Sequence, residues 1–147
     1  MMSYSNTSSL SAPLGLLLLR VGLGVVFLMH GLQKINEWTI DGTASNFQQM
    51  GIPSPEIAAT MAAYAELAGG IALIVGLLSR IAGLVLAVDM FGAIYFAHGS
   101  HGFFSSGGGY EFPLVLALAS LAVFLLGPGR FAIAGGLENR RGWGIFA

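Results

Sequence analysis

Residues 13–35 read PLGLLLLRVGLGVVFLMHGLQKI, and this stretch decides the fold class. Arg20 is its one charged residue before Lys34. A helix of about 20 mostly apolar residues crosses a hydrocarbon core of roughly 30 Å, so the stretch predicts a membrane-spanning helix. A cleaved signal peptide is the alternative. It fits less well, because residues 1–12 contain no Lys or Arg and the apolar run is longer than an h-region of about 7–15 residues.

The composition of the whole chain also indicates a membrane protein. Of its 147 residues, 55% are hydrophobic and 9% are charged, against roughly 25% charged residues in a soluble domain. Six Lys and Arg residues against seven Asp and Glu residues leave no basic patch for nucleic acid. The chain contains no cysteine, which excludes thiolate nucleophiles and cysteine-ligated iron–sulfur clusters. Any redox chemistry would therefore need a bound cofactor or a partner.

Three further apolar runs follow the first, and we expect an all-α integral membrane four-helix bundle in a single domain. The expected helices are 13–35, 55–78, 80–98 and 110–127, and the tail 130–147 is expected to lie along the membrane interface. The long connection after the first helix contains a candidate amphipathic helix at 43–50. The glycine-rich connection before the fourth helix is expected to be a flexible surface loop.

Four ionisable residues fall inside the expected spans, where charge is costly and each is a candidate functional residue: Arg20, Glu66, Asp89 and, near the far end of the first helix, His30. At 1.5 Å per residue, Arg20, Glu66 and Asp89 lie at depths of about 10, 18 and 13 Å from the same side of the membrane. We expect them to form a buried charge cluster in which Arg20 pairs with Glu66, Asp89 or both. Such a cluster could be a structural ion pair, or it could bind a ligand or relay protons.

A second polar group lies at the opposite ends of the expected helices. Its members are His30, Lys34, His98, His101 and Glu111. Imidazole and carboxylate groups bind metals, and they also form hydrogen bonds to a quinone head group. Histidine titrates near pH 6.5 and could supply the protons that quinone reduction consumes. The simpler alternative for each histidine is a side chain that extends to the membrane interface and binds nothing.

Several short motifs occur in a specific order along the chain. They are HGLQK at 30–34, GIP at 51–53, ELAGG at 66–70, GLLSR at 76–80, GFF at 102–104, GGYEFP at 108–113 and GPGR at 127–130. In this order and spacing the sequence resembles the DoxX family of small four-helix bacterial membrane proteins, over about residues 13–133. The positions that match the family pattern are Arg20, His30, Lys34, Glu66, His98 and Glu111, whereas Asp89 follows from the helix argument alone.

The resemblance implies a redox-associated membrane subunit. The family is named for its association with thiosulfate:quinone oxidoreductase, and some members are linked to oxidative-stress complexes with superoxide dismutase and a sulfurtransferase. Three functions remain open: a quinone-binding subunit of a redox system, a non-catalytic structural or assembly subunit, and a small oligomeric transporter or proton pathway. As an enzyme, the chain would be at most a subunit of a quinone-linked oxidoreductase.

The expected surroundings are the lipid bilayer and a protein partner or further copies of the chain, without nucleic acid. Arg80, Arg130, Arg140 and Arg141 lie on one side of the expected bundle, and Lys34 lies on the other. The positive-inside rule therefore predicts a multi-pass protein of the bacterial inner membrane with both termini in the cytoplasm.

Overall fold

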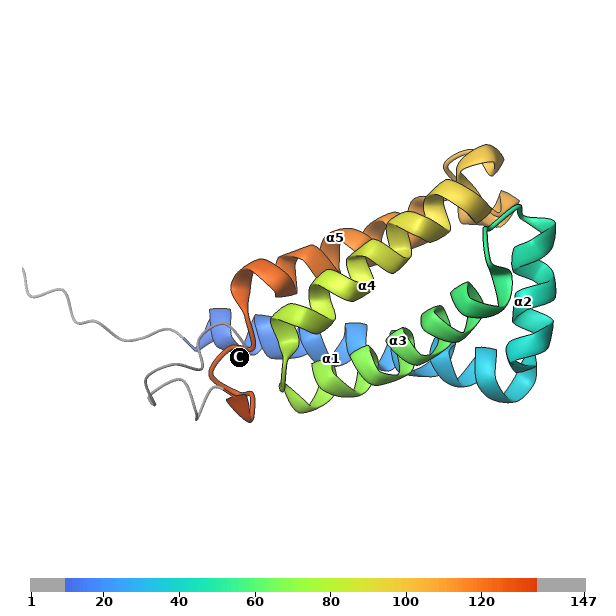
Figure 1. Ribbon diagram of the computed structural model, residues 1–147. Helices are drawn as coiled ribbons and strands as arrows, with labels where there is room; N and C mark the ends of the chain where they lie inside the picture. Colours follow the sequence, from blue (N-terminus) through green and yellow to red (C-terminus); the bar gives the residue numbers. More distant parts are fainter. Residues whose placement is uncertain (1–9, 135–147) are drawn as a thin grey trace, which may run out of the picture.

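The computed structural model describes residues 10–134, in which helices are joined by short connections (Figure 1). The elements are α1 Ser11–Leu32, the π-helical turn η1 Gln33–Glu37, α2 Thr39–Gln49, α3 Pro55–Val75, α4 Ser79–Ala93, the π-helical turn η2 Ile94–His98, the 3₁₀ turns η3 Gly99–His101 and η4 Ser105–Gly107, and α5 Glu111–Leu126. No strand occurs within residues 10–134. The predicted all-α fold class is confirmed.

The lengths of the helices suit a membrane bundle. Three continuous helical segments are long and apolar enough to cross a membrane: Ser11–Glu37 with 27 residues, Pro55–Val75 with 21 and Ser79–His101 with 23. The fourth, α5, has 16 residues and rises about 24 Å. Its shortness agrees with the short fourth run in the sequence. The second helix ends at Val75, before the predicted limit of 78, because Gly76 adopts a left-handed backbone conformation with φ of 77°.

Close approach of backbones holds the helices together in pairs. α1 packs along α3, and α4 packs along α5. A Cβ atom on Gly31 of α1 would lie 2.6 Å from the backbone nitrogen of Leu67 in α3, and one on Gly70 would lie 2.5 Å from that of Leu28. Glycine is therefore needed at both positions for α1 and α3 to approach this closely. The remaining core is apolar, with Phe27, Leu73, Leu86 and Val123 fully buried.

The bundle has two ends of different construction (Figure 1). We call the end with the α3–α4 connection and the start of α1 the turn end, and the end with α2 the α2 end. At the α2 end, α2 lies crosswise to α1 and α3 (Figure 1). The helix spans Thr39–Gln49, one turn earlier than the 43–50 predicted from the sequence.

The glycine-rich connection before α5 has a defined fold at the α2 end. Its two sides are joined by backbone hydrogen bonds, from Tyr110 N to Gly102 O at 3.0 Å and from Glu111 N to Phe103 O at 2.9 Å. At the turn end, Ala134 N donates to Gly76 O at 3.1 Å, so the start of the tail 130–147 is attached to the end of α3. The position of the tail along the membrane interface stays a prediction. The rest of that tail lies outside the described residues.

Candidate functional site

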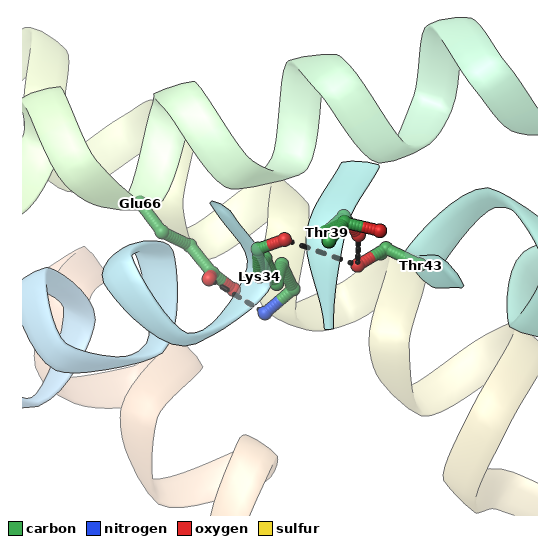
Figure 2. Close-up of polar contacts among 4 residues, drawn as sticks. All are labelled: Lys34, Thr39, Thr43 and Glu66. Atoms are coloured by element: carbon green, nitrogen blue, oxygen red, sulfur yellow. Dashed lines mark hydrogen bonds and ion pairs between the residues drawn. The ribbon is translucent and has the colours of Figure 1, made fainter. Parts of the chain in front are cut away.

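A buried ion pair joins α3 to the helical extension of α1 (Figure 2). Nζ of Lys34 lies 2.6 Å from Oε2 of Glu66, and the side chains are 12% and 4% exposed. At this separation the ammonium group donates a charge-assisted hydrogen bond to the carboxylate. A charged pair in this position costs free energy to desolvate, so its mutual attraction has to offset that cost.

Neighbouring residues position Lys34 from two sides. It lies in η1, one turn beyond Gly31, where the backbones of α1 and α3 are in close contact. The hydroxyl of Thr43 in α2 donates to Thr39 O at 2.9 Å and lies 3.5 Å from Lys34 O, which links α2 to η1 (Figure 2). Nζ of Lys34 also lies 5.9 Å from the centre of the Trp38 ring, within range of a cation–π interaction.

Asp89 of α4 adds a second carboxylate to this ion pair. It interacts electrostatically with both Glu66 and Lys34. Its Oδ2 atom is buried and accepts no hydrogen bond from any of residues 10–134. The Asp89 side chain is also hydrogen-bonded to the Glu66 side chain, and a hydrogen bond between two carboxyl groups needs a proton on one of them. One acceptor atom, Oδ2 of Asp89, stays unused. We call Lys34, Glu66 and Asp89 the acidic cluster.

Arg20 is not part of the acidic cluster, so the predicted pairing of Arg20 with Glu66 or Asp89 is wrong. Its Nη2 atom donates to Phe131 O at 3.0 Å, and its guanidinium group packs against Gly76 at the end of α3. Glu66 lies ten residues before Gly76 in the sequence, which is about 15 Å along the helix axis. Lys34, and not Arg20, is the cation beside Glu66 and Asp89.

The residues of the second predicted group make separate local contacts in the structure. His98 Nδ1 donates to Gly108 O at 2.7 Å, and Glu111 Oε1 accepts from Ser105 N at 2.6 Å. Both side chains therefore hold the connection between α4 and α5 in shape. His101 is exposed, and the His30 ring lies 6.3 Å from the ring of Phe112. Lys34 belongs to the acidic cluster.

Metal binding by this second group is not supported by the geometry. In the part of the chain that the structure describes, no three or more His, Cys, Asp or Glu residues are arranged to hold a metal ion. Within this group, Nδ1 of His98 and Oε1 of Glu111 are each hydrogen-bonded to a backbone group of the same connection.

A family model described as DoxX matches residues 15–99, which include most of α1 and all of η1, α2, α3, α4 and η2. The chain belongs to the DoxX family. The matched range contains all three residues of the acidic cluster together with Arg20, His30 and His98, whereas His101 and Glu111 lie beyond it.

Three bacterial relatives are similar to this DoxX protein over most of its length. A Bacillus subtilis (strain 168) protein named "Putative oxidoreductase CatD" is 37% identical over 117 residues, which cover 80% of this chain and 82% of that protein. An uncharacterised membrane protein of Mycobacterium tuberculosis is 28% identical over 138 residues, which cover 87% of this chain and 84% of that protein. An uncharacterised protein of Haemophilus influenzae is 32% identical over 124 residues, which cover 82% of this chain and 89% of that protein. No solved structure matches the chain at a significant level.

The sequence contains a signal that places Lys34 in the DoxX bundle core. Arg20, Gly24, Phe27, Gly31 and Lys34 follow one another at alternating spacings of four and three residues. This spacing puts them on one face of a helix. Gly24, Phe27 and Gly31 are all buried, so the same face carries Lys34 toward α3. The comparison of residue depths in the membrane does not use this helical spacing, so it did not identify Lys34.

Proposed function

We propose that this DoxX protein is a membrane subunit of a redox system and that it binds a quinone head group at the acidic cluster. The observation that carries the proposal is the buried Lys34–Glu66 ion pair with the unused acceptor of Asp89 beside it. A buried polar group without a partner is costly in an apolar bundle, and functional sites are where such costs are found. The oxidoreductase name of the Bacillus subtilis relative agrees with this direction.

The chemistry of the cluster suits a quinone for two reasons. Quinone carbonyl oxygens accept hydrogen bonds, and the Lys34 ammonium group has three N–H donors, of which one is directed to Glu66. Reduction of a quinone to a quinol consumes two protons and two electrons. Two carboxylates around one ammonium group can carry an exchangeable proton toward the head group. The electrons would come from a partner protein, since the chain has no cysteine for an iron–sulfur cluster.

Of the three histidines, His30 is the closest in sequence to Lys34 of this site. It precedes Lys34 by four residues and lies on the same side of α1, next to Phe112 of α5. We propose that His30 supplies protons between the cluster and the α2 end. His98 and Glu111 shape the adjoining connection.

The test is the quinone content of the purified protein. The chain is extracted in a mild detergent from membranes that contain quinone, and bound quinone per chain is measured by chromatography. Lys34→Met removes the donor, and we expect quinone content to fall about tenfold or more, as for loss of a hydrogen bond to a charged group. Asp89→Asn should also lower it. Glu56→Gln is the matched control, because Glu56 lies exposed in the first turn of α3.

The outcomes separate the three functions. Quinone that is lost from Lys34→Met and Asp89→Asn but kept by Glu56→Gln supports the proposal. A wild-type protein that co-purifies with a partner but with no quinone contradicts it and supports the structural subunit. Proton or solute flux across vesicles by the wild-type chain alone, without quinone, would support the transporter.

A further inference from the structure

Arg20 is a buried arginine whose hydrogen bonds are incomplete. The residue is 1% exposed, and its Nη2 atom donates to Phe131 O at 3.0 Å. Its Nε and Nη1 atoms are buried and donate to no atom of residues 10–134. A buried donor without an acceptor costs about 1–3 kcal/mol, and more when the group is charged. The guanidinium group therefore has two donors, Nε and Nη1, for which residues 10–134 supply no acceptor.

The described turn end offers Arg20 no carboxylate. Arg80 and Arg130 lie at the same end, and Arg80 Nη1 already donates to Phe124 O and Leu125 O at the end of α5. The carboxylates in residues 10–134 lie in the middle of the bundle or at the α2 end: Glu37, Asp41, Glu56, Glu66, Asp89 and Glu111. An anion for Arg20 would have to come from outside this part of the chain.

Arg20 lies at the level where the other helices stop. Its guanidinium group packs against Gly76, directly after the last residue of α3. The α3–α4 connection and the end of α5 lie at this same end of the bundle (Figure 1). Helices that span the hydrocarbon core end near the headgroup region, so Arg20 is placed at the depth of lipid phosphates.

A short non-helical segment covers Arg20. We call Phe131–Ala134 the strap. Besides the Phe131 contact, the strap is held by Ile133 N to Val75 O at 3.4 Å and Ala134 N to Gly76 O at 3.1 Å. A Cβ atom on Gly76 would collide with both Nη1 of Arg20 and the Cβ of Ala132. The free Nη1 donor therefore lies between two of the smallest residue types, under a segment that is attached to α1 and α3 by hydrogen bonds.

We propose that Arg20 binds a phosphate group at the turn end, from an anionic phospholipid headgroup or from free phosphate. When a phosphate oxygen replaces Phe131 O on Nη2, either neighbouring donor, Nε or Nη1, completes a two-pronged contact. Arginine recognises phosphate in this paired geometry. The strap is then displaced from Arg20, and the positive charge of Arg20 is neutralised.

The test compares lipids and anions on the purified full-length protein. Thermal stability in neutral detergent is measured with added phosphatidylglycerol, with phosphatidylcholine, and with inorganic phosphate or chloride at matched ionic strength. Native mass spectrometry counts the lipids that stay bound. We expect phosphatidylglycerol to raise the melting temperature of the wild type and to leave one tightly bound lipid, whereas phosphatidylcholine does neither. Ligands that bind only the folded state stabilise it in this way.

Three substitutions at the turn end test the site. Arg20→Gln should abolish the gain, and Arg130→Gln should keep it, because Arg130 is exposed and its loss removes the same charge. Arg20→Lys keeps the charge but not the two-pronged geometry, so it should bind about tenfold more weakly even if Arg20→Gln does not fold.

The remaining outcomes are decisive. An equal gain from inorganic phosphate identifies a site for free phosphate, and a gain from the lipid alone identifies the headgroup. The proposal is wrong if the wild type responds equally to phosphatidylglycerol and phosphatidylcholine and shows no response to inorganic phosphate. It is also wrong if Arg130→Gln removes as much of the gain as Arg20→Gln.

Discussion

Lys34 is the residue on which the geometry of the acidic cluster depends. Its ammonium group is the single cation beside two carboxylates, and it lies where α1, α2 and α3 meet. Removing one member of a buried ion pair leaves the other charge without compensation, and this costs more than the pair itself contributes. The loss of stability on replacing one residue of the cluster therefore tests whether that residue is paired.

We expect Lys34→Met to lower the free energy of unfolding by about 3–5 kcal/mol, because Glu66 is then a buried charge without its partner. The double variant Lys34→Met with Glu66→Leu should recover most of this loss, since two apolar side chains replace a pair of similar volume. Unfolding in detergent by a chemical denaturant measures both. Losses that simply add in the double variant would show that the two residues do not interact in the folded protein.

The wrong prediction that Arg20 pairs with Glu66 or Asp89 shows which property of single residues could not be obtained from the sequence. The residue types that belong inside the bundle were evident, because charge inside an apolar span is rare. The partners were not evident, because depth was counted from the helix starts as if these were level. In the structure Arg20 lies beside Gly76 at the end of α3, about 15 Å along the axis from Glu66.

At the scale of elements, hydropathy located the spans because lipid requires helices of a certain length. It could not show that two helices continue as π-helical turns, η1 with Lys34 and η2 with His98. A π turn differs from an α turn by one hydrogen-bond partner, and the same residue types form both. The fold of the glycine-rich connection was also missed, because it depends on backbone bonds between its two sides.

Two glycines of α1 should respond in opposite ways to the same change. Gly31→Ala places a Cβ 2.6 Å from Leu67 N and 2.9 Å from Ala63 O, so α1 and α3 must separate. We expect a loss of about 1–3 kcal/mol in the free energy of unfolding. A Cβ on Gly22 meets no atom within 4 Å, so Gly22→Ala should be neutral or gain up to about 1 kcal/mol. Denaturation of both variants in the same detergent makes the comparison. Equal losses would mean that the α1–α3 contact does not set the stability.

At the scale of the whole molecule, charge is divided between the two ends of the bundle. Arg20, Arg80 and Arg130 lie at the turn end, and Lys34 lies toward the α2 end together with most of the carboxylates of residues 10–134. The division also separates the two proposed sites. The phosphate site at Arg20 and the acidic cluster would face opposite sides of the membrane, and they could work independently of each other.

The orientation of the chain follows from this division, because Lys and Arg residues near the ends of spans are retained on the cytoplasmic side. We therefore expect the turn end, with both termini, to be cytoplasmic in a bacterial inner membrane. A reporter enzyme that is active only in the periplasm should be inactive when fused after Ala147. It should be active when inserted in the connection at Gly51–Ser54, between α2 and α3. The reverse pattern would place the turn end in the periplasm. The acidic cluster would then open toward the cytoplasm, and its protons would have to come from that side.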